Sequence, residues 1–278
     1  MNNTARTFIA SAILVCLQVA LPVRADDNRV ITANSPAHRV ALLELYTSEG
    51  CSSCPPADRW LSALKTSDIT SEQLIPLAFH VSYWDYIGWK DRFASTQYDQ
   101  RQRKQAMLAN SRSVYTPQFM LNGRDYRGYR NLDGDIRKIN DEPGSLDLRM
   151  TITVTGPDIM DVRVDAGRVT DSKTAINIAL YENGLSSDVS DGENEGEHLS
   201  HDYVVRRFYT SKLQKSADNK ITVSQSIPVD KDWRKENMGV VAFAQDMDSG
   251  EVLQAVRVEM DTRALVSAVT QRLWAVNP

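Results

Sequence analysis

Two cysteines separated by two residues are the strongest candidates for chemistry in this chain of 278 residues. Cys51 and Cys54 follow an apolar run, residues 40–46, and a turn that ends in Gly50. The next segment, residues 57–64, has apolar side chains on one helical face. The order predicts a strand, a tight turn, Cys-x-x-Cys and a helix. Both cysteines then lie at a helix N-terminus, where unpaired N–H groups and the helix dipole stabilise a thiolate.

A thiolate at this position favours thiol–disulfide exchange, because the thiolate is the species that attacks a disulfide. Pro55 and Pro56 fit the first helical turn, where a missing N–H leaves no partner unsatisfied. Two other interpretations stay open. One is a structural disulfide, which would stabilise the fold only modestly because its loop is short. The other is a pair of metal ligands.

The first 25 residues have the pattern of a signal peptide. Arg6 is followed by a mostly apolar run, residues 8–21, and by Val-Arg-Ala at 23–25, which has the form of a cleavage site. We expect export to the periplasm or secretion, release after Ala25, and no membrane insertion of the mature chain. Cys16 would leave with the signal peptide; a lipid attached to it is the alternative.

Charge and cysteine content narrow the class of protein. Without residues 1–25, 30 basic side chains face 36 acidic ones, a net charge of −6. This balance gives no reason to expect nucleic acid or an anionic membrane as a partner. A mature chain of roughly 250 residues predicts one large or two ordinary domains. Two close cysteines in an exported protein do not make a disulfide-stapled scaffold.

Strand and helix signals alternate between residues 38 and 144. They predict strands over 40–46 and 75–82, helices over 53–65, 96–112 and 132–140, and a hairpin over 114–128. Asn122-Gly123 is the hairpin turn, and Pro117 must begin its strand because proline cannot sit inside a central one. The aromatic loop 83–89 either caps the core or forms a substrate-contacting wall near the cysteines.

This order, β–CxxC–α–β–α–Pro–β–turn–β–α, resembles a thioredoxin-like domain. The segments ELYTSEGCSSCPPAD, FHVSYWDYIGWKD and YTPQFMLNGR, within residues 43–124, more narrowly resemble a family of exported bacterial thioredoxin-like proteins of unassigned function. The resemblance implies an α/β thioredoxin-like domain over residues 38–144. It indicates fold and compartment, and it leaves the substrate open.

The resemblance also implies roles for five residues. Cys51 matches an exposed nucleophilic cysteine, and Cys54 matches the buried cysteine that resolves a mixed disulfide. Pro117 matches a cis-proline beside the sulfurs, which would turn the backbone of Thr116 toward them and toward a substrate chain. Glu44 is offered as a buried carboxylate that shuttles a proton for Cys54, although it lies seven residues before Cys51 and not six.

Residues 145–262 have a different pattern. Alternation of apolar and polar residues, clearest over 146–154, predicts an all-β sandwich-like domain, with residues 26–37 as a linker before the first domain and 263–278 as a closing helix. The acidic loop 188–202 is either solvated or a metal or partner site. We expect His198 and His201 to be hydrogen-bonded loop residues.

The predicted function is an exported thiol–disulfide oxidoreductase that uses a Cys51–Cys54 dithiol/disulfide. Its partners would be protein thiols or disulfides and a membrane redox partner, and we expect no cofactor and assign no metal ligands. Ser52 and Ser53 between the sulfurs predict an intermediate potential and leave reductase, oxidase and isomerase as alternatives. Two other functions stay open. One is a copper chaperone that uses the same cysteines, with His80 or Met120 as a third ligand, and the other is a non-catalytic binding protein.

Overall fold

The computed structural model describes residues 29–111, 113–127, 131–156, 158–168, 173–212 and 221–260. The predicted signal peptide, residues 1–25, and the predicted closing helix, residues 263–278, lie outside these residues. Among the helices in the described part of the chain, none is both long enough and apolar enough to cross a membrane.

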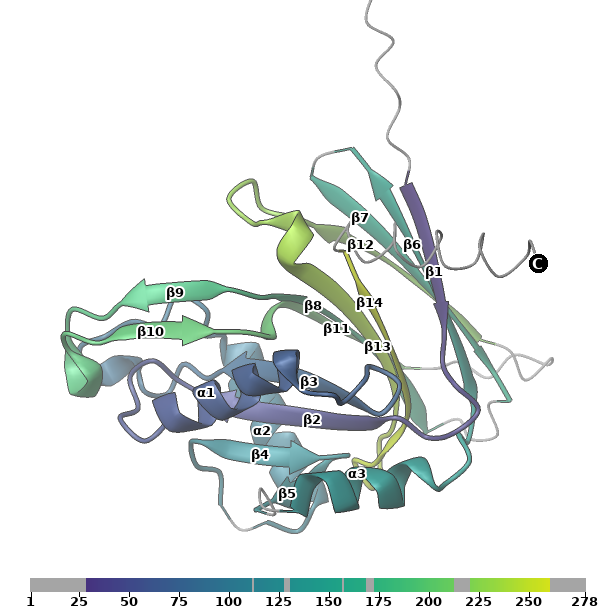
Figure 1. The fold of residues 1–278 in the computed structure, drawn as a ribbon, viewed down its shortest axis with the longest axis horizontal. Helices are drawn as coiled ribbons and strands as arrows, with labels where there is room; N and C mark the ends of the chain where they lie inside the picture. The colour runs from purple at the N-terminus through teal and green to yellow at the C-terminus, as the bar shows by residue number, and fades with distance from the viewer. Residues whose placement is uncertain are drawn as a thin grey trace, which may run out of the picture.

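Strands make up most of the regular structure (Figure 1). The helices are α1 (Pro55–Ala63), α2 (Thr96–Leu108) and α3 (Leu132–Asn140). The strands are β1 (Arg29–Asn34), β2 (Ala41–Thr47), β3 (Leu74–His80), β4 (Gln118–Leu121), β5 (Arg124–Tyr126), β6 (Asp147–Thr155), β7 (Ile159–Gly167), β8 (Thr174–Glu182), β9 (Leu185–Asp188), β10 (His198–His201), β11 (Val204–Lys212), β12 (Ile221–Pro228), β13 (Met238–Asp246) and β14 (Val252–Glu259).

One eight-stranded sheet runs through both parts of the chain, in the order β14-β13-β8-β11-β3-β2-β4-β5. β2 and β3 are parallel, as a strand–helix–strand unit around α1 requires. β11 lies parallel to β3 and contacts it where Val204 pairs with Ala78. The remaining neighbours in this sheet are antiparallel. β2 and β3 are buried along their whole length, which explains their continuous apolar sequence.

This sheet corrects the fold class expected from the sequence. A thioredoxin-like α/β domain over 38–144, followed by an all-β sandwich-like domain, is wrong. The structure is dominated by strands in several sheets, and it lacks an α/β core surrounded by helices. The edge of β3 is occupied by β11, which comes from the second part of the chain. Periodicity identifies strands and helices, but it does not show which distant strand pairs with a free edge.

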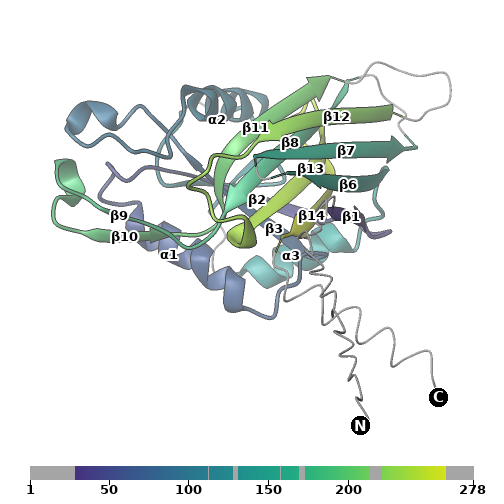
Figure 2. The ribbon, with the colours of Figure 1, turned by 90° about the horizontal axis from the view of Figure 1, so that it is seen from above.

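A second sheet, in the order β1-β6-β7-β12, packs on part of the first (Figure 2). β8 and β13 serve two cores because successive side chains of a strand point to opposite faces. Ile178 and Val240 join the core between the two sheets, whereas Tyr181 and Phe243 join the core around β2 and β3. The β-rich character predicted for residues 145–262 is therefore confirmed.

Two segments predicted to be irregular form strands. Arg29–Asn34, inside the predicted linker, is β1 and pairs with β6 along its whole length. Much of the acidic segment 188–202 belongs to a hairpin of β9 and β10, whose tip contains the 3₁₀ turn Gly192–Asn194. Figure 1 shows this hairpin extending beside α1, and β10 contacts α1 directly. We call residues 185–201 the hairpin arm.

Candidate functional site

The backbone between β2 and α1 fixes the positions of both cysteines. The N–H of Cys51 donates to the carbonyl of Ser48 at 3.2 Å, and the N–H of Cys54 donates to the carbonyl of Cys51 at 3.1 Å. Cys54 occupies the cap position of α1, and Pro55 opens the helix. The two sulfurs therefore lie at the positive end of the helix dipole.

Both cysteines are free thiols, and both are buried. Cys51 is 1% exposed and Cys54 is 0% exposed, whereas Ser52 and Ser53 between them are exposed. The expectation of an exposed nucleophile at Cys51 is therefore wrong for this conformation. The sulfur of Cys51 lies beneath the surface, directly under an exposed turn.

The tip of the hairpin arm holds the motif in this position. The side-chain amide of Asn194 donates to the carbonyl of Glu49 at 2.7 Å and to the carbonyl of Cys51 at 3.1 Å. The N–H of Ser52 donates to the carboxylate of Glu193 at 3.0 Å. The tip of the predicted acidic loop thus contacts the cysteine motif, while most residues of the segment are exposed.

A directed hydroxyl group lies against the sulfur of Cys51. The hydroxyl of Thr116 donates to Cys51 Sγ at 3.2 Å, and it accepts from the indole N–H of Trp84 at 2.7 Å. The indole N–H can only donate, so the proton of Thr116 is left for the sulfur. The Thr116–Pro117 peptide bond is cis, and the carbonyl oxygen of Thr116 lies 3.8 Å from the same sulfur. The aromatic loop therefore contributes Trp84 to the cysteine site.

The two sulfurs have opposite acidities. A hydrogen bond from Cys54 lowers the pKa of Cys51 to about 6 against the effect of burial, and hydrogen bonds from Ser53 and Thr116 lower it further. Burial raises the pKa of Cys54 well above its usual value, and the charges of Cys51 and Asp58 add to the rise. At neutral pH, Cys51 is therefore the thiolate and Cys54 the thiol.

Glu44 lies on the opposite face of β2 from the cysteine site. Its carboxylate accepts from Arg101 Nε at 2.7 Å, and both side chains are buried. Thr47, three residues further along β2, points to the other face, where its hydroxyl donates to Asp58 at 2.9 Å. Asp58 is the carboxylate whose charge raises the pKa of Cys54. The structure therefore favours Asp58 over Glu44 as the carboxylate that could exchange a proton with Cys54.

A buried polar cluster lies on the Thr47 side of β2. Asp58 comes from α1, His80 from the end of β3 and His201 from the end of β10. One ligand atom from each of these three lies within 4.8 Å of the others. Two further carboxylates contact the imidazoles. His80 Nδ1 lies 2.6 Å from Asp91, and His201 Nε2 lies 3.2 Å from Glu49. All five side chains are buried.

Charges within the cluster stabilise one another. Burial lowers the pKa of His201, but the nearby carboxylates of Asp58, 3.8 Å away, and Glu49 outweigh it and raise the pKa to about 10. Burial raises the pKa of Asp91, but the charge and hydrogen bond of His80 bring it below the usual value. Every ion pair between these carboxylates and another described residue is with a histidine.

Sequence analysis missed most of this cluster. It treated His201 as a loop residue and considered His80 only as a copper ligand beside the cysteines. Among the described residues, the group that includes His80 contains Asp58 and His201, and neither cysteine belongs to it. One signal was present in the sequence. His80 is a polar residue at the end of a continuously apolar, fully buried strand, and such a residue needs a buried partner.

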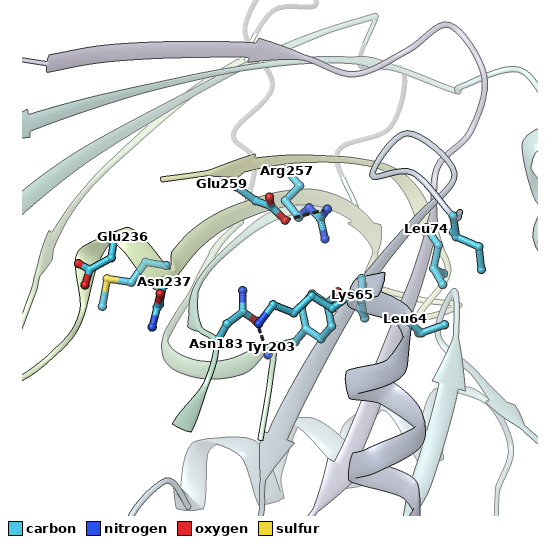
Figure 3. A pocket seen from close by; sticks show the side chains of 12 residues that line it. Leu64, Lys65, Leu74, Asn183, Tyr203, Glu236, Asn237, Arg257 and Glu259 are labelled. Atoms are coloured by element: carbon cyan, nitrogen blue, oxygen red, sulfur yellow. Dashed lines mark hydrogen bonds and ion pairs between the residues drawn. The ribbon is translucent and has the colours of Figure 1, made fainter. Parts of the chain in front are cut away.

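A separate pocket of about 370 Å³ lies near the end of α1 (Figure 3). Lys65, Asn183, Glu236, Arg257 and Glu259 supply its polar wall, and Figure 3 shows their side chains around it. Neither the cysteines nor the buried histidines line this pocket. The chemistry of the cysteine site is therefore built from the motif and the hairpin arm, and not from this cavity.

The fold and the cysteine site define a β-rich protein with a buried dithiol, and comparisons place it in a family. Residues 42–245 match a family described as protein of unknown function, DUF1223, and the chain belongs to that family. A search of proteins with curated functions gives no match.

Two solved structures share the architecture. Protein AGR_C_4864 from Agrobacterium tumefaciens is 25% identical over 82% of this chain and 97% of its own, with a TM-score of 0.57. HBP35 of Porphyromonas gingivalis is 14% identical over 82% of this chain and 77% of its own, with a TM-score of 0.63. At this identity, the second likeness shows the fold alone.

Proposed function

We propose that the protein is an exported thiol–disulfide oxidoreductase that acts through Cys51 and Cys54. The observation that carries the proposal is the hydroxyl of Thr116, which Trp84 holds in the orientation that donates to Cys51 Sγ. A hydrogen bond to a charged acceptor is among the stronger ones in proteins. The contact therefore stabilises the thiolate, which is the nucleophile of disulfide exchange.

The reaction has two steps. The thiolate of Cys51 attacks one sulfur of a substrate disulfide, a mixed disulfide forms, and the other substrate sulfur leaves as a thiolate that takes a proton. Cys54 then loses its proton and attacks Cys51 Sγ, which releases the second substrate thiol and leaves a Cys51–Cys54 disulfide. Two electrons pass from the protein to the substrate. The reverse sequence oxidises a substrate dithiol.

Cys51 is 1% exposed, so a substrate reaches its sulfur only when segments around the motif move apart, and the tip of the hairpin arm is one segment that contacts the motif. The contacts of Asn194 and Glu193 with the motif are hydrogen bonds, and each of the two made by the buried Asn194 amide contributes about 1 kcal/mol to the closed position. Local opening at this cost is compatible with a folded core. A protein substrate would then reach the sulfur from the exposed side of Ser52 and Ser53.

The proposed compartment is supported by the signal-peptide pattern of residues 1–25. A thiol pair in the periplasm works in an oxidising environment, so a membrane redox partner would restore its starting state. Cleavage after Ala25 gives a mature N-terminus at Asp26. Sequencing of the N-terminus of protein isolated from the periplasm checks this point, and an intact Met1 would contradict it.

Trapping of a mixed disulfide tests the proposed chemistry. The reduced mature chain is mixed with glutathione disulfide and analysed by mass spectrometry. We expect the wild type to end with an internal disulfide, Cys54→Ser to hold one glutathione on Cys51, and Cys51→Ser to react far more slowly. Ser52→Ala, which removes an exposed hydroxyl from the same turn, is the matched control. A folded wild type that stays reduced, or a Cys51→Ser variant as reactive as the wild type, would overturn the proposal.

A further inference from the structure

The cluster of Asp58, His80 and His201 contains two buried ring nitrogens that have no hydrogen-bond partner. His80 Nε2 and His201 Nδ1 are buried and have no hydrogen-bond partner, in side chains that are 0% and 2% exposed. A buried polar atom without a partner costs stability, so it needs an explanation. His201 Nδ1 lies 3.8 Å from Asp58 Oδ1, and His80 contributes its atom to the same small space.

Charge in this cluster is also unbalanced. Three buried carboxylates, from Glu49, Asp58 and Asp91, face two imidazoles. The ion pairs of these carboxylates within the described part of the chain involve no lysine or arginine. Because buried charge is costly unless it is paired, the cluster favours an added cation.

The outer contacts are those of a metal site. Metal-binding histidines usually direct their second ring nitrogen to a carboxylate, which fixes the ring and raises its basicity. His80 does this with Asp91, and His201 does it with Glu49. Asp58 Oδ2 accepts from Thr47 at 2.9 Å, which leaves Oδ1 on the side of the histidines. One ring nitrogen of each histidine is thus held by a carboxylate, and the other nitrogen of His201 lies beside Asp58.

We propose that Asp58, His80 and His201 bind one divalent transition metal ion, with Zn²⁺ as the best match. Two imidazoles and one carboxylate suit zinc and its neighbours, whereas Ca²⁺ and Mg²⁺ prefer oxygen alone. In a tetrahedral zinc site with Zn–N bonds of about 2.0–2.1 Å, ligand atoms lie roughly 3.4 Å apart. The observed separations are at most 4.8 Å, so the bound ion would require the three side chains to move closer together by up to about 1.4 Å. Three protein ligands leave a fourth position open.

The ion would join three separate elements. Asp58 lies one turn along the helix that begins at Cys54, and His201 ends the strand of the hairpin arm that packs on this helix. A metal ion at this position would hold the arm, whose tip contacts the backbone of the cysteine motif, against the helix that carries the motif. The site therefore differs from a copper site built from the two cysteines.

Zinc binding to the metal-free mature chain tests the proposal. Isothermal titration and native mass spectrometry should show one Zn²⁺ per chain. His80→Asn, His201→Asn and Asp58→Asn should each weaken binding by more than about 100-fold, since even a change in an outer contact costs 10–100-fold. His198→Asn is the matched control, because His198 lies on the same strand with its side chain 61% exposed. The Cys51→Ser/Cys54→Ser double variant should keep the full stoichiometry, which separates this test from the thiol chemistry.

Two measurements keep the test valid if a ligand variant fails to fold. Co²⁺ bound to the wild type should show the absorption of a tetrahedral nitrogen–oxygen site without a sulfur-to-cobalt charge-transfer band. Asp91→Asn should keep one site and weaken zinc binding by about 10–100-fold. A folded wild type that binds no zinc, a charge-transfer band from sulfur, or unchanged zinc binding in His80→Asn and His201→Asn would each overturn the proposal.

Discussion

Buried charges lie on both faces of β2, but they are balanced on only one of them. On one face, a single carboxylate, Glu44, meets a single guanidinium, Arg101. The guanidinium also lies over the rings of Phe208 and Phe243, at 4.7 and 5.2 Å from their centres. On the other face, Thr47 leads to a cluster in which carboxylates outnumber imidazoles.

The difference separates a structural contact from a binding site. Glu44 and Arg101 neutralise each other, and the aromatic rings around them enclose the pair. His80 Nε2 and His201 Nδ1 have no hydrogen-bond partner, and one ligand atom each from Asp58, His80 and His201 lies within 4.8 Å of the others. A buried ion pair by itself is weak evidence of function. Glu44 Oε2 also lacks a hydrogen-bond partner, so what distinguishes the histidine cluster is its excess of carboxylates and the convergence of three ligand atoms.

Removal of Arg101 gives the largest expected effect. Arg101→Met leaves Glu44 buried without a counter-charge, which should lower the free energy of unfolding by about 3–5 kcal/mol. Urea unfolding followed by circular dichroism measures the loss. The double variant Glu44→Leu/Arg101→Met should regain most of it, and zinc stoichiometry should stay at one per chain where the variant is folded. A loss below about 1 kcal/mol would show that the two faces do not differ in the way described.

Removal of Asp58 should behave in the opposite way. In the presence of a chelator, Asp58→Asn removes one charge from an excess and should stay within about 1 kcal/mol of the wild type. At free zinc 100 times the Kd, the wild type should gain about 2.7 kcal/mol and Asp58→Asn should gain almost nothing. Unfolding curves with chelator and with zinc measure both values. A loss of about 3 kcal/mol with chelator would make Asp58 a structural residue like Glu44.

Local structure follows closely from the sequence. The helix predicted over 132–140 is α3, and Asn122 and Gly123 form the predicted turn, with φ values of 46° and 83°. Both features depend on residues that are close in the chain. The pairing of β11 with β3 does not, because it joins Val204 to Ala78. No periodicity in either strand specifies that partner, so the fold class expected from local order is wrong.

The same distinction between local and long-range contacts applies to the candidate site. Sequence analysis singled out Cys51, Cys54 and Thr116, which lie in or beside short motifs. It did not find the partnership of His201 with Glu49, since the two residues are 152 positions apart. Their contact exists because the hairpin arm folds back over α1. The charge-rich composition of the hairpin arm indicated that it could hold functional polar residues. It did not indicate which of them point toward the core, because tertiary packing decides that.

Loss of the Thr116 hydroxyl tests whether the acidity of Cys51 can be changed independently of the proposed metal site. Thr116→Val removes a donor to the Cys51 thiolate, worth about 1.5–3 kcal/mol, so the pKa of Cys51 should rise from about 6 by about one unit or more. Iodoacetamide reacts with the thiolate, so the alkylation rate of Cys51 increases with pH around the pKa of Cys51. The midpoint of this pH profile should move to higher pH in Thr116→Val. Thr32→Val, at an exposed position, is the control. An unmoved midpoint would mean that the hydroxyl does not set the acidity.

Weakening the contacts of the hairpin tip should have the smallest effect, and it should change the accessibility of Cys51 rather than its pKa. Asn194→Ala removes the two hydrogen bonds that hold the backbone of the motif, about 1 kcal/mol each. Opening should become about 30-fold more frequent, so Cys51 should be alkylated up to about 30-fold faster at pH 8. The pH midpoint should stay unchanged, because access and not acidity is altered.

Glu193→Gln, at an exposed contact, should change the rate less than about twofold. A midpoint that moves in Asn194→Ala would show that the arm sets the acidity of Cys51 as well as its exposure. The unbalanced face of β2 and the thiol pair would then form a single site.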